Sequence, residues 1–227
     1  MVIITGASQG VGRFLLDRYV SKGELVVGTF NNTRPSTNTD CYHKLDVRDA
    51  DAVSDFCERI GAGVEEPVML INCAGVNIND FAHKADPGEW AHVIDTNLLG
   101  TFNMMRALLP VMRGRGGGTI INFSSVVALR ATPGVSAYAA SKAALGGLTK
   151  SVMMENAKLG ITVNNINLGY STLGMISQVP EKFMSRLKEQ IPCERLCEPE
   201  DIFRTVEFIR ATKYLNRTSI NLTGGLE

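Results

Sequence analysis

The sequence predicts an α/β domain with a doubly wound sheet of about seven mostly parallel strands and helices on both faces. Short apolar runs rich in β-branched residues alternate with longer amphipathic stretches along the chain. The short runs are apolar almost throughout, which is typical of strands buried on both faces of a parallel sheet. Parallel neighbours need right-handed crossovers, and these place helices over both faces.

The first expected strand is short, apolar and β-branched, and Phe14, Leu15 and Tyr19 recur at helical spacing in the stretch that follows it. The same two patterns repeat to the end of the chain. We expect strands at Val2–Thr5, Leu25–Thr29, Cys41–Leu45, Val68–Asn72, Thr119–Phe123, Thr162–Asn167 and Ser219–Leu222. We expect helices at Gly12–Lys22, Ala50–Ile60, Pro87–Arg113, Ser136–Lys158 and Pro199–Ala211. Residues 31–40 are polar and contain Pro35, so the second crossover is expected to be a loop.

The whole chain, residues 1–227, is expected to form a single domain. Hydrophobic residues make up 44% of it, enough for a buried core, and no repeat or long linker divides it. Charges cancel to +0 and basic residues are scattered, so no nucleic-acid partner is expected. No apolar stretch is long enough to span a membrane, and the first strand begins at Val2, so we expect no membrane partner and a cytoplasmic protein. Five irregularly spaced cysteines favour reduced thiols, and no metal site is expected.

A glycine-rich turn, Thr5 to Gly12, lies between the first strand and the first helix. Gly6 permits a tight turn, and Gly10 lets backbone N–H groups approach a pyrophosphate. Gly12 lets the helix pack closely on the strand. A plain turn can have the same spacing, but the position directly after the first strand favours a dinucleotide site.

Polar, glycine-rich segments follow several of the expected strands. They are Asp46-Val47, Asn72 to Gly75, Ser124-Ser125 and Leu168 to Ser171. Each one alone could be an ordinary turn. Because the carboxyl ends of parallel strands share one edge, together they predict a ligand site there.

Tyr138 and Lys142 are four residues apart in an expected helix, and Ser125 lies at the end of an apolar run upstream. The spacing places the phenol and the ammonium on one helix face. With a hydroxyl beside them, they can pass a proton to or from an oxygen while a cofactor moves a hydride.

These features resemble the short-chain dehydrogenase/reductase family over nearly the whole chain, most closely the branch of the 3-oxoacyl-carrier-protein reductases. The matching motifs are the Thr5 to Gly12 loop, Asp46-Val47, Asn72 to Gly75, Asn97, Ser125, Tyr138 with Lys142, Glu198 to Asp201, and Gly224-Gly225. The resemblance implies a Rossmann-type fold and hydride transfer between a nicotinamide cofactor and a ketone or secondary alcohol.

The resemblance also implies a role for each site residue. Tyr138 would be the general acid in reduction and the base in oxidation, with Lys142 favouring its phenolate and binding the nicotinamide ribose. Ser125 would hold the substrate carbonyl, and Asn97 would hold a water for proton relay. The cofactor would be bound by Gly6, Ser8, Gln9, Gly10, Val11, Gly12, Asn31, Asp46, Val47, Asn72, Ala74, Gly75, Tyr138, Lys142, Gly169 and Ser171.

NADP is favoured over NAD as the cofactor. An NAD site usually has an acidic residue about twenty positions beyond the glycine loop. This chain has Asn31 in that region and no carboxylate before Asp40. Arg34 could reach a 2′-phosphate, whereas Gln9 stands where many NADP-using relatives have a basic residue.

Two departures from the family pattern affect the nicotinamide pocket: Leu168 stands in place of a proline and Leu173 in place of a threonine. Residues 172–197 are expected to form a substrate lid. The apolar side chains expected to face the pocket or the lid's own packing are Met175, Ile176, Val179, Phe183 and Met184. An apolar lid favours a hydrophobic or acyl-chain ketone as substrate.

Three hypotheses follow from the sequence. The leading one is an NADPH-dependent carbonyl reductase of the 3-oxoacyl type, acting on a small-molecule ketone. The second is an NAD-dependent secondary-alcohol or polyol dehydrogenase. The third, of another class, is a cofactor-bound regulatory protein without turnover. Small residues on the helix that carries Tyr138, together with the resemblance, imply a homodimer or homotetramer.

Overall fold

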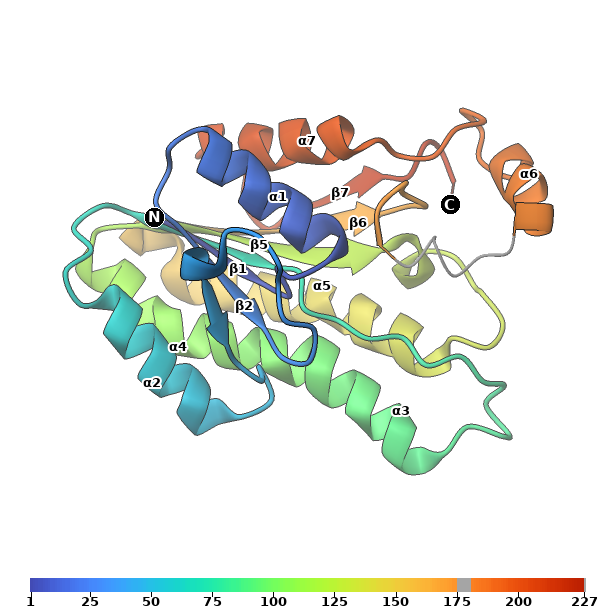
Figure 1. The fold of residues 1–227 in the computed structure, drawn as a ribbon, viewed down its shortest axis with the longest axis horizontal. Coiled ribbons are helices and arrows are strands. Elements are labelled where there is room, and N and C mark those ends of the chain that lie inside the picture. The colour runs from blue at the N-terminus through green and yellow to red at the C-terminus, as the bar shows by residue number, and fades with distance from the viewer. Residues whose placement is uncertain (175–180, 227) are drawn as a thin grey trace.

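The computed structural model describes residues 1–174 and 181–226, and within them seven parallel strands form one sheet. The strands are β1 Val2–Thr5, β2 Val26–Phe30, β3 Tyr42–Lys44, β4 Val68–Asn72, β5 Gly118–Ser125, β6 Ile161–Leu168 and β7 Ser219–Leu222. Their order is β3-β2-β1-β4-β5-β6-β7, so the winding reverses between β1 and β4 (Figure 1). The doubly wound parallel sheet expected from the sequence is confirmed.

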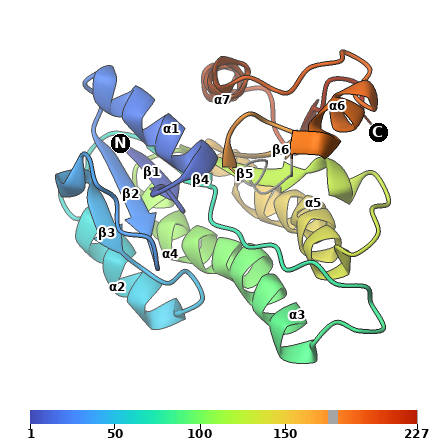
Figure 2. The same cartoon turned by 45° about the vertical axis from the view of Figure 1, so that its right-hand side comes forward.

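Helices cover both faces of the sheet (Figure 1 and Figure 2). Helices α1 (Gly10–Ser21) and α7 (Pro199–Ala211) lie on one face, and α2 (Ala50–Gly61), α4 (Gly100–Gly114) and α5 (Ser136–Asn156) lie on the other. Two further helices, α3 (Pro87–Ile94) and α6 (Glu181–Glu189), lie toward the carboxyl end of β5. None of the helices in the described part of the chain is long and apolar enough to cross a membrane.

Each face of the sheet has its own hydrophobic core. Successive side chains of a strand point to opposite faces. Val2 and Ile4 therefore pack in the same cluster as Leu15 of α1. Ile3, between them, belongs to the cluster that contains Phe56 of α2. All five side chains are essentially inaccessible to solvent, so β1 is covered on both sides.

A row of buried amides crosses the sheet. Asn72 of β4 donates to Asn122 of β5 at 2.9 Å, and Asn122 donates to Asn165 of β6 at 3.2 Å. Thr149 of α5 accepts from Asn122 at 3.1 Å and donates to Asn165 at 2.6 Å. Buried polar groups need partners, so this row helps to fix the register of the three strands and attaches α5 to them.

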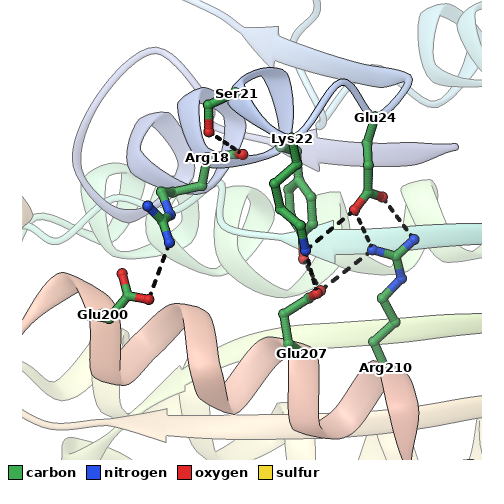
Figure 3. A network of polar contacts seen from close by, with 8 residues as sticks. Arg18, Ser21, Lys22, Glu24, Glu200, Glu207 and Arg210 are labelled. Atoms are coloured by element: carbon green, nitrogen blue, oxygen red, sulfur yellow. Dashed lines mark hydrogen bonds and ion pairs between the residues drawn. The ribbon is translucent and has the colours of Figure 1, made fainter.

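A cluster of polar contacts joins α1 to α7 (Figure 3). Lys22 and the buried Tyr19 both donate to Glu207 at 2.9 Å, and Arg210 pairs with Glu24 at 2.8 Å. Ion pairs that are partly exposed contribute little individually. Together with the core beneath them, they hold in place the helix whose first turn belongs to the glycine loop.

The expected helix Pro87–Arg113 is interrupted by a π-helical turn, Asp95–Leu99, between α3 and α4. Asn97 lies in this turn, where its amide donates to the Val76 carbonyl at 2.9 Å and accepts from the Val76 N–H at 2.8 Å. A single wide turn often marks a functional site. The periodicity of the sequence does not show it, because apolar spacing continues on both sides.

The other differences concern element ends and one helix. β5 and β6 are longer than expected because they pair with each other along their full length. Helix α5 ends at Asn156 and continues as the 3-10 turn Ala157–Leu159. Helix α6, inside the expected lid, was not expected as a helix. The second crossover is a loop with a short 3-10 turn, Thr39–Cys41, as predicted.

Candidate active site

The glycine loop is shaped by close backbone approaches. Gly6 has φ +62°, and a Cβ on it would lie 2.7 Å from the Ala74 Cα. A Cβ on Gly12 would lie 2.5 Å from the Gly6 carbonyl oxygen. Gln9 precedes the first turn of α1 and makes no side-chain capping hydrogen bond. The first N–H groups of α1 are therefore not capped by Gln9, as a phosphate-binding turn requires.

A cavity of about 630 Å³ lies at the carboxyl ends of the strands, a size typical of ligand pockets. Most of the predicted site residues line it: Gly6, Ser8, Gln9, Gly10, Val11, Gly12, Asn31, Asp46, Val47, Ala74, Gly75, Ser125, Tyr138, Lys142, Gly169 and Ser171. Leu168 and Leu173, the two departures from the family pattern, line it as well. The tertiary structure thus brings six separate strand ends and loops to one cavity.

Tyr138, Lys142 and Ser125 come together at the wall of this cavity. The Ser125 side chain is near enough to the Tyr138 hydroxyl to lower its pKa. The Lys142 Nζ lies 5.6 Å from the centre of the Tyr138 ring and donates to the Phe123 carbonyl at 2.7 Å. Ser124 donates to the Lys142 carbonyl at 2.9 Å, which attaches α5 to the end of β5. All of these groups are buried.

Burial controls the protonation of both groups. It raises the pKa of Tyr138, and the nearby Ser125 side chain acts in the opposite direction. Burial lowers the pKa of Lys142 to about 8, and nearby Cys73 acts in the opposite direction. Burial is the largest effect on Tyr138, and the role of Lys142 in favouring its phenolate stays a prediction. Tyr138 is a protonated phenol at neutral pH, suited to donate a proton.

Asn72 and Asn97 lie behind the cavity wall and do not line it. Asn72 belongs to the row of amides in the sheet. Asn97 is fully buried, donates to Ser141 at 3.0 Å and holds the backbone of Val76. The Asn97 side chain therefore positions the loop after β4 from behind. The cofactor contact of Asn72 and the water contact of Asn97 stay predictions.

Several lining residues were not selected from the sequence. Arg48 and His92 line the cavity, and so does Thr29, whose Oγ1 is buried without a hydrogen-bond partner among the described residues. Arg34, expected to reach a phosphate, is exposed and is not among the described residues that line the cavity. Arg48 could have been selected from the sequence, because it lies two residues beyond Asp46 at the end of a strand. No sequence signal points to His92, because its helix is distant in sequence from the strand ends.

The expected lid, residues 172–197, is partly described. Its two ends are joined, since Thr172 N–H donates to the Cys197 carbonyl at 3.0 Å and Cys197 N–H to the Tyr170 carbonyl at 2.8 Å. Met184 packs against a cluster that includes Ile191 and Leu196 of the same segment and also Val126 and Leu226 outside it. Met175, Ile176 and Val179 lie outside the described residues, as does the side chain of Phe183.

A doubly wound sheet whose glycine loop and Tyr138–Ser125–Lys142 set share one cavity defines a dinucleotide-binding oxidoreductase. The family model described as "short chain dehydrogenase" matches residues 1–182, and the chain belongs to this family. Members act on CH–OH or carbonyl groups, and this chain is an oxidoreductase of that kind.

Relatives with named activities cover almost the whole chain. An acetoacetyl-CoA reductase of Rhizobium meliloti is 35% identical over 99% of this chain and 97% of its own. A 3-oxoacyl-[acyl-carrier-protein] reductase of Staphylococcus epidermidis is 30% identical over 99% and 97%. Among solved structures, the aldohexose dehydrogenase of Thermoplasma acidophilum matches with a TM-score of 0.92 at 28% identity, over 99% of this chain and 92% of that one. A 3-oxoacyl-[acyl-carrier protein] reductase from Brucella melitensis matches with a TM-score of 0.90 at 28% identity, over 99% and 90%.

Proposed function

We propose that this chain is an NADPH-dependent carbonyl reductase acting on 3-oxoacyl thioesters. The observation that carries the proposal is that Ser125, Tyr138 and Lys142 line one cavity together with the glycine loop, with Lys142 one helical turn from Tyr138. Burial raises the pKa of Tyr138, so the phenol is protonated at neutral pH and has a proton available for a ketone oxygen. The relatives named as reductases of acetoacetyl-CoA and of 3-oxoacyl carrier protein support the substrate class.

The residues of the site fit a nicotinamide dinucleotide. Gly6, Gly10 and Gly12 form a cradle in which a side chain on any of them would meet backbone atoms. The first turn of α1 offers N–H groups to a pyrophosphate. Thr29 has a buried hydroxyl at the cavity, which suits a ribose hydroxyl. When bound, the reduced cofactor supplies the hydride.

Each catalytic side chain has a separate task in this proposal. Ser125 donates a hydrogen bond to the ketone oxygen, which orients the carbonyl and opposes charge build-up on that oxygen. Tyr138 gives its phenolic proton to the same oxygen. Lys142, charged below its pKa of about 8, stabilises the phenolate that remains. Asn97 fixes the loop that carries Val76, and so positions the wall of the cavity.

We also propose that residues 1–227 form one domain in which residues 172–197 are the substrate lid. The support is the pairing of the two ends of the segment next to the cavity residues Tyr170 and Ser171. A loop whose two ends lie close together can be filled by its own side chains. The apolar character of the segment suits an acyl chain.

We propose a homo-oligomer because α4, α5 and the turn before α4 expose apolar side chains. Leu99, Phe102 and Met154 are 43%, 40% and 69% exposed, although they are large and apolar. Gly146 and Gly147 of α5 have open space around them. Exposed apolar residues beside small ones suit contact with another copy of the chain. The five cysteines are free thiols, which supports the proposed cytoplasmic location.

A dehydrogenase of sugars or polyols is the second candidate. Asn77, Asn79 and Thr132 line the cavity, and polar groups of this kind can bind sugar hydroxyls. The aldohexose dehydrogenase among the similar structures gives this candidate independent support.

The test is a substrate panel followed by absorbance of the reduced nicotinamide. Acetoacetyl-CoA and other ketones are offered with NADPH or NADH, and aldohexoses and secondary alcohols with NADP⁺ or NAD⁺. We expect oxidation of NADPH with acetoacetyl-CoA. Turnover with an aldohexose alone would favour the second candidate. Binding of cofactor without any turnover would favour the regulatory protein instead.

A further inference from the structure

We infer that Arg48 determines the preference for NADPH over NADH, by neutralising the charge of Asp46 beside the site of the adenosine ribose. The inference rests on the proposed function, because it assumes that the cavity binds a nicotinamide dinucleotide. It concerns a residue that the sequence motifs did not select.

Asp46 is the only carboxylate among the described residues that line the cavity. It follows β3, and Asn31, which follows β2, lines the same cavity near enough for its side chain to lower the pKa of Asp46. In dinucleotide-binding folds the residue about twenty positions after the glycine loop contacts the ribose 2′ position, and Asn31 occupies that region. The Asp46 carboxylate is therefore near the group that would meet a 2′-hydroxyl or a 2′-phosphate.

Arg48 neutralises this carboxylate in a bidentate arrangement. The Arg48 Nε lies 3.0 Å from Oδ1 and 3.1 Å from Oδ2 of Asp46. The Arg48 Nη2 donates to Oδ2 at 2.5 Å, and the Arg48 backbone N–H donates to Oδ1 at 3.0 Å. These hydrogen bonds lower the pKa of Asp46 to about 2. The carboxylate is thus charged at neutral pH, and only the guanidinium offsets its repulsion of a phosphate.

His92 of α3 holds the other side of the guanidinium. The Arg48 Nη1 lies 2.9 Å from the His92 Nδ1. A guanidinium has no acceptor, so His92 Nδ1 is the acceptor in this contact. The guanidinium is therefore held from two elements, β3 with its following turn and α3, and its planar fork keeps this geometry at little entropic cost.

Among the described residues that line the cavity, no other cation lies at the adenosine end. Among the described residues that line the cavity, Arg48 and Lys142 are the lysines and arginines. Lys142 lies beside Tyr138 at the opposite end. Arg13, near the loop after β2, is engaged with Thr37 and Asp17 and does not line the cavity. A bare Asp46 would therefore face a 2′-phosphate without a compensating charge.

The test measures the dissociation constants of NADPH and NADH for the full chain by fluorescence titration at low and high salt. Arg48→Leu should weaken NADPH binding about tenfold relative to NADH, an effect that shrinks at high salt because the charges are partly exposed. Arg48→Lys should keep most of the preference. The double variant Asp46→Asn/Arg48→Leu should recover the wild-type ratio of the two constants.

Arg59→Leu, on α2 and outside the described cavity lining, is the matched control, and its ratio should equal that of the wild type. Equal weakening of both cofactors in Arg48→Leu, or a double variant that does not recover the ratio, would overturn the inference and indicate a merely structural arginine. A wild-type protein that binds neither dinucleotide would overturn the proposed function as well. A wild-type protein that binds both, with an unchanged ratio in Arg48→Leu, would overturn this inference alone.

Discussion

Tyr138 shows how the environment of a single side chain can set its protonation state. The side chain lies beside Ser125 and is removed from water, and burial raises its pKa. A phenol of this kind keeps its proton at neutral pH and can donate it to a developing alkoxide. In the oxidation direction the same group would first have to lose that proton, which burial opposes.

Tyr138→Phe should reduce ketone turnover by about 10²–10⁴-fold, because positioned proton transfer contributes on that order. Cofactor binding should persist, since the ring and Lys142 remain. The measurement is steady-state kcat for acetoacetyl-CoA reduction together with NADPH titration. Tyr214→Phe, at a fully exposed tyrosine, is the matched control. Unchanged turnover in Tyr138→Phe would remove the proton-donor assignment.

The buried ammonium of Lys142 predicts a pH-dependent stability. Its pKa is about 8 in the folded protein, and about 10.4 in an unfolded chain. Between these values the unfolded chain binds a proton that the folded one lacks, so the free energy of unfolding rises with pH. The lowered pKa therefore costs stability below pH 8, and this cost disappears as the pH rises toward 10.

Lys142→Met should remove this part of the pH dependence. Urea unfolding of the cofactor-free protein at pH 7.5, 9 and 10 would measure it, with about 1.4 kcal/mol expected for each unit of pKa shift. The difference between wild type and variant cancels the titration of other groups. Parallel pH profiles for the two proteins would show that Lys142 keeps an ordinary pKa.

At the scale of elements, the site depends on how closely α1 approaches the end of β1. Gly12 is inside the first turn of α1 and faces the Gly6 carbonyl. A single methyl group there would force the helix away from the loop, and the N–H groups of its first turn would move with it. The π-helical turn before α4 also shapes the site, because it directs the Asn97 side chain to the loop after β4.

Gly12→Ala should lower the free energy of unfolding by about 1–3 kcal/mol, the usual cost of overpacking, and should weaken NADPH binding. Gly114→Ala is the matched control, because Gly114 ends α4 and a methyl group added there would meet nothing within 4 Å. That variant should bind NADPH normally. If Gly12→Ala binds NADPH as tightly as the wild type, the close approach is not needed for the cofactor.

At the scale of the whole molecule, the reversal of winding between β1 and β4 creates the place for the cavity. Loops on the two sides of this point diverge, one toward β2 and the other toward β5, and a ligand can lie between them. The two hydrophobic cores hold the sheet rigid beneath that edge, so the site rests on fixed elements.

The exposed apolar residues Leu99, Phe102 and Met154 predict an association of whole molecules. Phe102→Glu should lower the mass measured by light scattering after size exclusion, because it places a charge in the proposed contact. Leu25→Glu, at a residue that is 63% exposed before β2, is the control and should leave the mass unchanged. A wild-type protein with the mass of one chain would contradict the proposed oligomer.

Local sequence patterns were enough to predict the sheet, most helices and the residue types of the site. Buried parallel strands have apolar runs, glycine is required where a backbone turns or approaches closely, and Tyr138 and Lys142 share a helix face because they are four residues apart. These are local properties, so the order of residues reveals them.

Contacts between distant segments could be read from the three-dimensional structure alone. It placed Arg48 between Asp46 and His92 and directed Asn97 to Val76. It also showed that burial is the largest effect on the pKa of Tyr138, because desolvation is produced by all the elements around a side chain. Such effects depend on which segments meet in space, and neither periodicity nor a local motif carries that information.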